Sequence, residues 1–357
     1  MSLNPILSLK KIIAIMTFSS FCILTFGQKS FKNSFESSLS YGRILAHRND
    51  LKSIILNNSY SFEASMNFLT NGSKPYHYHY IFPTFGWTIH YTSSGNTNNI
   101  GNIIATYGSI KFPLSKKIKP LCFRLGLGAG WVEKKFDLER NYKNLAIGSN
   151  INLNIQLKFE KIFSFKKQHE IKYAILLNHL SNGSYKRPNL GLNIFQIQAS
   201  HSFGIKSQNI DTSFKEFIHS SERNLYIYNI SGFKENKTGS QELFYINETA
   251  IQYEHRKNVK SSFSNGIDIL NNYSIKPTTN KILQIGINIG HSLNIGNIKI
   301  NTQLGCHIYN KGESYRRIYN KITIDYLLTK RISTRLSLRS HLFSADFAGI
   351  GFGYKLI

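Results

Sequence analysis

The chain has 357 residues and a formal net charge of +25, with 44 Lys and Arg against 19 Asp and Glu, and it contains only 3 cysteines. These figures exclude a small disulfide-stapled domain and an acidic disordered protein. Aromatic residues make up 13% of the chain, with 25 Phe and 20 Tyr against 7 Pro, and aromatic residues favour β-strands. An all-α fold is therefore not expected. The basic charge alone would suit a nucleic-acid partner.

The N-terminus has the pattern of a secretory signal peptide and argues against a nucleic-acid partner. Lys10 and Lys11 precede an apolar run over residues 12–26, and small residues stand before Gln28. We expect residues 1–27 to be a signal peptide, because the run is shorter than the roughly twenty residues that a membrane helix needs. A retained N-terminal anchor is the alternative. Two cysteines then remain, Cys122 and Cys306, which are too few for a disulfide framework and are expected to be unbridged.

After the signal peptide, apolar and polar residues alternate in segment after segment, as in strands with two different faces. The clearest segment is 151–160, in which every odd-numbered residue is apolar and every even-numbered residue is polar. In chain order, the pattern predicts strands near residues 34–45, 59–70, 78–92, 102–114, 121–135, 151–160, 169–181, 193–200, 223–233, 242–257, 283–290, 298–308, 322–329, 334–343 and 348–356.

Segments of about ten residues with one apolar and one polar face are typical of a transmembrane β-barrel with a lipid-facing wall. We therefore predict an all-β fold: a transmembrane antiparallel up-and-down β-barrel in the bacterial outer membrane. Because such barrels close with an even number of strands, we expect about fourteen, with twelve or sixteen as alternatives. Residues 28–357 are predicted to form this single barrel, with the polar stretches 206–221 and 234–241 as loops. A soluble β-sandwich is the competing fold.

One predicted strand, residues 169–181, carries polar groups on its apolar face. Its odd-numbered residues are apolar up to Leu177 and then continue with His179 and Ser181. The next strand begins its outward face at Asn193, and a hairpin symmetric about Arg187 would place Ser181 opposite Asn193, roughly 5 Å away at Cβ. These three residue types supply the parts of nucleophilic catalysis: a nucleophile, a general base and a group that orients the base.

The segment N-H-L-S-N-G-S-Y-K-R-P-N-L-G-L-N, residues 178–193, resembles the lipid A 3-O-deacylase (PagL-type), or acyloxyacyl hydrolase, family of outer-membrane esterases. The family signature is His-x-Ser-Asn followed by Pro-Asn-x-Gly. The resemblance extends upstream through Phe82-Pro83, the stretch 99–114 and the stretch 126–150, and covers roughly residues 35–205. The remainder of the chain exceeds what the short eight-stranded members of the family need.

The resemblance implies that His179 is the catalytic base and Ser181 the nucleophile of an esterase that removes the 3-O hydroxyacyl chain from lipid A. Asn193 stands where the family has an acidic residue. Either an amide orients the imidazole here, or another acid substitutes, or the activity is weak. The resemblance also points to Asn182 and Asn189, or nearby backbone N–H groups, as donors to the oxyanion.

The residues themselves add two candidate phosphate contacts, Lys186 and Arg187 in the hairpin loop, which suit lipid A or lipopolysaccharide as partner. No cofactor and no metal is expected. His77 and His79 alternate among tyrosines and are interpreted as part of an interfacial aromatic belt, not as metal ligands. His341, Ser344 and Asp346 are interpreted as a turn. Two other functions stay open: a non-catalytic barrel, either a pore or a lipopolysaccharide-binding protein, and an esterase acting on phospholipids.

Overall fold

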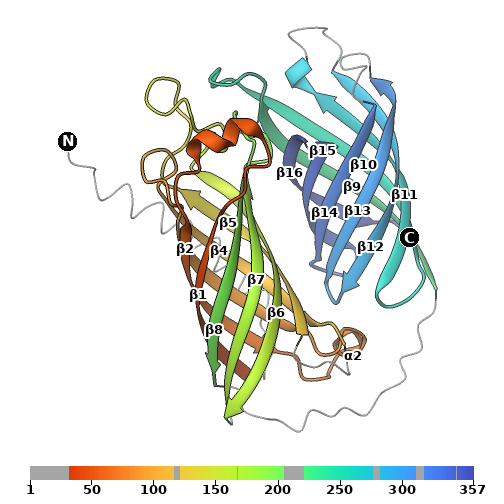
Figure 1. The fold of residues 1–357 in the computed structure, drawn as a ribbon. Coiled ribbons are helices and arrows are strands. Elements are labelled where there is room, and N and C mark those ends of the chain that lie inside the picture. The colour runs from red at the N-terminus through yellow and green to blue at the C-terminus, as the bar shows by residue number, and fades with distance from the viewer. Residues whose placement is uncertain are drawn as a thin grey trace. The chain divides into compact units, whose positions relative to one another are not determined.

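The computed structural model describes residues 32–115, 121–166, 168–204, 221–275, 282–310, 317–342 and 344–357. The predicted signal peptide lies outside this part of the chain. Over the described residues the fold is all-β, with sixteen antiparallel strands and only short helical segments, so the predicted fold class is confirmed (Figure 1). Among these residues no helix has the length and apolar composition needed to cross a bilayer.

The first eight strands close into one barrel, in which each strand pairs with the next and β1 pairs with β8. In chain order, this part of the chain contains β1 (Lys32–Ile44), η1 (Asn49–Ile54), β2 (Ser59–Leu69), the short helix α2 (Pro75–His79), β3 (Thr84–Ser93), β4 (Asn102–Pro113), β5 (Leu121–Val132), β6 (Ile151–Lys166), β7 (His169–Ser181) and β8 (Leu192–Phe203).

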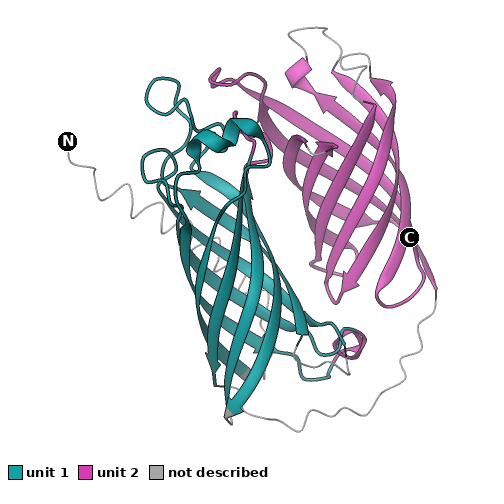
Figure 2. Ribbon diagram, in the orientation of Figure 1, with its two compact units in different colours: residues 1–73, 80–181, 191–213 teal, residues 74–79, 182–190, 214–357 magenta. Residues whose placement is uncertain are grey.

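The second eight strands close into a separate barrel, in which β9 pairs with β16. Its elements are β9 (Glu222–Glu235), β10 (Leu243–Arg256), β11 (Ser261–Asn272), η2 (Tyr273–Ile275), β12 (Leu283–Ile295), β13 (Ile298–Asn310), β14 (Ile318–Leu327), β15 (Ile332–His341) and β16 (Ser344–Lys355). The chain accordingly divides into two compact units, of which unit 1 contains the first barrel and unit 2 the second (Figure 2). Two short segments, 74–79 and 182–190, are also parts of unit 2.

The expectation of a single barrel over residues 28–357 is therefore wrong. Alternation of apolar and polar residues reports which face of a strand points outward, but it carries no information about which strands close on each other. The first barrel ends at Phe203 and the second begins at Glu222, on either side of the stretch 206–221 that we interpreted as a loop. The sequence pattern also missed β11, because Asn265 and Asn271 interrupt its outward face and Leu270 points inward.

The predicted strand 78–92 is also corrected. Residues 75–79 form helix α2, and β3 begins only at Thr84. Ile81 and Phe82 adopt positive φ angles of 57° and 54°, and Pro83 follows, so the extended conformation cannot continue through this turn. The alternation of His77 and His79 with tyrosines was therefore not a strand pattern.

The outer walls of both barrels are mostly apolar, as predicted, although Asn229, Asn247 and Thr249 form a polar patch on the second barrel. Outward-facing side chains such as Leu39 and Ile175 in the first barrel, and Ile289 and Phe352 in the second, are 68%, 49%, 67% and 65% exposed. On β7 the odd-numbered residues face outward and the even-numbered residues from Lys172 to Leu180 are buried. A soluble sandwich would bury such a continuous apolar face, so this pattern favours a lipid-facing barrel.

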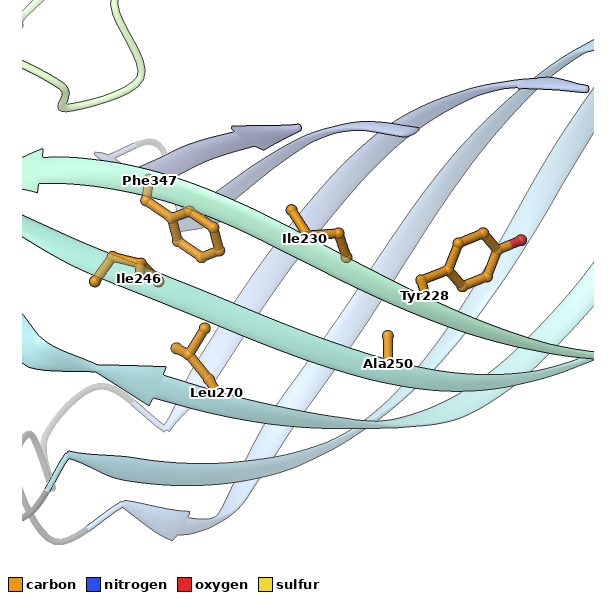
Figure 3. Close-up of a cluster of buried hydrophobic side chains, with 6 residues drawn as sticks. All are labelled: Tyr228, Ile230, Ile246, Ala250, Leu270 and Phe347. Atoms are coloured by element: carbon orange, nitrogen blue, oxygen red, sulfur yellow. The ribbon is translucent and has the colours of Figure 1, made fainter. Parts of the chain in front are cut away.

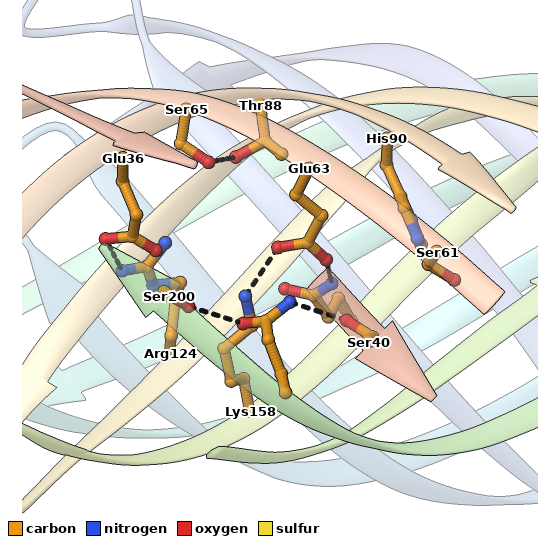
Figure 4. A network of polar contacts seen from close by, with 12 residues as sticks. Glu36, Ser40, Ser61, Glu63, Ser65, Thr88, His90, Arg124, Lys158 and Ser200 are labelled. Carbon is orange, nitrogen blue, oxygen red and sulfur yellow. Dashed lines mark hydrogen bonds and ion pairs between the residues drawn. The ribbon is translucent and has the colours of Figure 1, made fainter. Parts of the chain in front are cut away.

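Charged side chains fill the lumen of the first barrel (Figure 4). Glu36 Oε2 lies 3.1 Å from Arg124 Nη2 and 2.6 Å from Lys172 Nζ. Glu63 Oε2 lies 2.6 Å from Lys158 Nζ, and these side chains are at most 1% exposed. An eight-stranded barrel is just wide enough for side chains to fill it, so this interior is a packed polar core.

The second barrel combines a similar charge network with an apolar cluster. Lys321 Nζ bridges Glu248 and Asp268 at 2.8 and 2.6 Å. Six buried side chains form the apolar cluster, which draws on four strands: Tyr228, Ile230, Ile246, Ala250, Leu270 and Phe347 (Figure 3). Both barrels are therefore filled by their own side chains over the described residues.

Candidate active site

The three predicted site residues meet at one end of β7 and β8, on the outer wall of the first barrel. His179, Ser181 and Asn193 face outward, as predicted, and all three are half-buried. The register differs from the prediction: Asn193 pairs with His179, not with Ser181. Leu180 pairs with Leu192, so the hairpin is centred on Lys186, one residue earlier than the symmetric hairpin assumed, and the pairing shifts by two.

This register produces a continuous chain of hydrogen-bonding groups. His179 Nδ1 lies 2.7 Å from Asn193 Oδ1, and His179 Nε2 lies 3.0 Å from Ser181 Oγ. Because an amide oxygen can only accept, the proton of the neutral imidazole belongs on Nδ1. Nε2 is then left as the acceptor that faces the serine hydroxyl.

A fourth residue, His47, was missed by sequence reasoning. Its Nδ1 lies 3.0 Å from Asn193 Nδ2. His47 follows β1 and is 146 residues away from Asn193 in the chain. The closure of the barrel brings the two together, because β1 pairs with β8 and Leu45 N–H donates to Asn193 O at 2.7 Å. No local pattern around His47 signals this contact.

Gly191 supports the imidazole from the hairpin loop. Its φ is +82°, and a Cβ built on it would lie 2.8 Å from His179 Cε1. Its N–H donates to Ala146 O at 2.9 Å, which ties the site to the loop between β5 and β6. The glycine of the Pro-Asn-x-Gly motif therefore provides both the left-handed backbone and the space that the His179 ring occupies.

The two candidate oxyanion donors are joined to each other. Asn182 N–H donates to Asn189 Oδ1 at 3.0 Å. Asn182 Nδ2 donates to Lys186 O at 3.0 Å, so this side chain orders its own loop. With Oδ1 of Asn189 facing Asn182, the Nδ2 end of Asn189 points the other way.

The two candidate phosphate contacts lie near an acidic side chain of unit 2. Arg187 N–H donates to Glu235 Oε2 at 2.6 Å. Lys186 Nζ lies 3.8 Å from Glu235 Oε1, with a quarter of its side chain exposed. Part of the positive charge expected to meet phosphates is therefore balanced by Glu235, and the role of Lys186 and Arg187 stays a prediction.

The other polar clusters do not form a metal site. No group of three or more His, Cys, Asp or Glu side chains within the described residues could hold a metal ion. His77 is buried in helix α2, where burial lowers its pKa to about 4. His341 Nε2 lies 3.6 Å from Asp346 Oδ2 beside the turn between β15 and β16. Cys122 and Cys306 are both free, as expected.

An apolar hollow of about 850 Å³ lies on the same outer wall as the site, farther along β7 and β8. Its outward-facing lining includes Leu39, Tyr173, Ile175, Ile197 and Ala199. Ala199 is small among large neighbours, which leaves room beside it.

The fold and the site together define a class of protein: an antiparallel β-barrel that carries a Ser–His–Asn chain on a mostly apolar outer wall. Residues 24–202 match the lipid A 3-O-deacylase (PagL) family, and residues 221–357 match the acyloxyacyl hydrolase C-terminal domain. The chain belongs to the lipid A 3-O-deacylase family. The boundary between the two matches agrees with the boundary between the two barrels.

Other comparisons add little. Among solved structures, the chain is similar to engineered variants of a porin from Rhodopseudomonas blastica, at 8% and 7% identity and with TM-scores of 0.18 and 0.17. In both cases 92% of this chain and 100% of that chain are covered. No curated protein matches.

Proposed function

We propose that the protein is an outer-membrane esterase that hydrolyses the 3-O ester bond of lipid A and releases a hydroxy fatty acid. The observation that carries the proposal is the chain Ser181–His179–Asn193, with contacts of 3.0 and 2.7 Å, on the outward face of the barrel. Membership of the lipid A 3-O-deacylase family supplies the reaction type. Polar side chains on a lipid-facing wall are costly unless they have a function.

In the first step Ser181 attacks the ester. The Ser181 hydroxyl donates to His179 Nε2, which accepts the proton as Oγ bonds to the acyl carbonyl carbon. Asn193 Oδ1 accepts from His179 Nδ1–H and holds the ring in the tautomer that this transfer requires. The oxyanion of the tetrahedral intermediate accepts from Asn189 Nδ2 or from backbone N–H groups of the loop.

In the second step the intermediate collapses. The C–O bond to the glucosamine breaks, and His179 returns its proton to the leaving 3-hydroxyl group. Water then attacks the acyl-serine, with His179 again accepting the proton. The bond between the acyl carbon and Ser181 Oγ breaks, His179 returns the proton to Oγ, and the hydroxy fatty acid departs. The reaction consumes one water and needs no redox partner.

The position of the site on the barrel wall suits a substrate that lies in the membrane. Lipid A occupies the outer leaflet of the outer membrane, so its ester bonds would meet the wall near the end of the strands. The apolar hollow along β7 and β8 offers a surface for an acyl chain, and Lys186 and Arg187 lie in the adjacent loop, where they suit the phosphates of the headgroup.

The filled interiors argue against a pore. Arg124 and Lys158 in the first barrel and Lys321 in the second are at most 1% exposed and are held in ion pairs. A water-filled channel would expose such groups, as it does in larger barrels. We therefore favour an enzyme over a porin-like function.

Mass spectrometry of lipid A tests the proposal. Cells that express the protein should lose one ester-linked hydroxyacyl chain from lipid A, and cells that express Ser181→Ala at equal membrane levels should not. Equal loss with Ser181→Ala would refute the mechanism. Purified protein should also be assayed on phospholipid vesicles, since preferential cleavage there would assign a phospholipase instead.

A further inference from the structure

The carboxamide of Asn193 has two ends of similar shape and opposite polarity. In the structure Oδ1 faces His179 Nδ1 at 2.7 Å, and Nδ2 faces His47 Nδ1 at 3.0 Å. A carboxylate at this position would offer two equivalent acceptors, so its orientation would not matter. An amide must be held the right way round, because its flipped form presents an N–H group to His179.

The orientation of the amide decides whether His179 can act as a base. If Nδ2 faced His179, the imidazole would have to accept at Nδ1 and carry its proton on Nε2. That proton would point at Ser181 Oγ, and the serine could not be deprotonated. In a serine protease, the corresponding change from acid to amide costs about 10⁴ in rate by selecting the wrong tautomer.

His47 breaks this symmetry when its proton is on Nε2, because its Nδ1 is then an acceptor. Since Asn193 Nδ2 can only donate, the contact requires a lone pair on His47 Nδ1. In this tautomer, the flipped amide would place Oδ1 against that lone pair and lose the hydrogen bond, and only a move of the His47 proton to Nδ1 would restore it. Two backbone hydrogen bonds anchor the segment that carries His47, since Leu45 N–H donates to Asn193 O at 2.7 Å and His47 N–H donates back to Leu45 O at 3.1 Å.

We propose that His47 is a positioning residue: it fixes the orientation of the Asn193 carboxamide and thereby the reactive tautomer of His179. The inference rests on the proposed function for its kinetic consequence. The four side chains then form one hydrogen-bonded chain, His47–Asn193–His179–Ser181. In this chain His47 fixes an orientation that a carboxylate at position 193 would not need to have fixed.

The test combines three variants at position 47 with two residues at position 193. His47→Gln keeps an acceptor and should retain activity within about threefold. His47→Leu removes the acceptor and should lower kcat about tenfold, the effect of one hydrogen bond. His47→Lys supplies only donors, favours the flipped amide and should lower kcat about 100-fold. With Asn193→Asp in place, His47→Lys should cost less than about twofold, because either carboxylate oxygen accepts from His179.

A spectroscopic readout separates this inference from the proposed function. In ¹⁵N NMR of the labelled protein, His179 should carry its proton on Nδ1 in the wild type and shift towards the Nε2–H tautomer with His47→Lys. That result would stand even if lipid A were not the substrate. His201→Leu, a substitution elsewhere on the outward face of β8, is the matched control and should change neither readout. Unchanged tautomer and kcat with His47→Lys, or equal losses with His47→Gln and His47→Lys, would overturn the inference.

Discussion

Replacing Gly191 by alanine should damage the reaction far more than the fold. The new Cβ would lie 2.8 Å from His179 Cε1, whereas carbon atoms in contact are separated by about 3.5–4.0 Å. The ring must therefore move by roughly 0.7 Å or more. A misplacement of about 1 Å at a reacting group can cost 10²-fold in rate, so we expect kcat to fall by about 100-fold.

The cost to stability can be separated from this effect. Alanine at a positive φ costs about 1–2 kcal/mol wherever it occurs. Gly204 has a φ of +93°, but a Cβ there would lie 3.4 Å from its nearest neighbour, Asn33 O. Gly204→Ala is thus a matched control: it carries the same backbone strain without touching the imidazole.

Both variants should be purified in detergent and compared by urea unfolding and by steady-state deacylation of lipid A. We expect similar losses of unfolding free energy, and a loss of kcat only for Gly191→Ala. Equal kcat values for the two variants would refute the view that Gly191 makes room for the His179 ring. A large drop in the folded fraction of Gly191→Ala alone would show that its role is structural.

Three further predictions concern the hydrogen-bonded chain, the lumen and the outer wall. Asn193→Asp should raise kcat by only about tenfold, because Asn193 Oδ1 already orients the His179 ring and the gain is only that of a charge-assisted over a neutral hydrogen bond. A gain near 10⁴-fold would show that the amide does not orient the ring in the wild type. Glu36→Gln should lower the unfolding free energy by about 3–5 kcal/mol in urea titrations, because it breaks buried ion pairs. Glu170 also pairs with Lys172 but is partly exposed, so Glu170→Gln should lower the unfolding free energy by less than about 1 kcal/mol. Ala199→Trp should fill the apolar hollow and reduce kcat/KM about tenfold on lipid A while sparing a short-chain ester; equal losses on both substrates would argue against an acyl-chain surface there.

The sequence predicted the strands better than their assembly. Alternation identified the inward and outward faces of β6 and β7 correctly, because side-chain direction has a period of two residues in any strand. Closure depends on pairing between segments distant in the chain, such as β1 with β8 and β9 with β16. Nothing in the local pattern distinguishes two barrels of eight strands from one larger barrel.

The candidate site shows the same limit at a finer scale. His179, Ser181 and Asn193 could be found because they belong to one hairpin and one motif. Their register was wrong by two residues, because the hairpin is centred on Lys186 and not on Arg187. His47 could not be found at all, because its contact with Asn193 exists only after the barrel has closed.

The pairing of β1 with β8 affects how active the site can be before the barrel has folded. β7 and β8 alone can bring His179 and Asn193 together, but the group that orients the amide arrives with the first strand, which must meet the last one of its barrel. Before β1 and β8 pair, His47 would not contact Asn193. The Asn193 carboxamide could then adopt either orientation, and His179 would be a weaker base for Ser181. Under the proposed function, closure of the barrel would therefore raise the rate of hydrolysis by about the same tenfold that His47→Leu is expected to lower it.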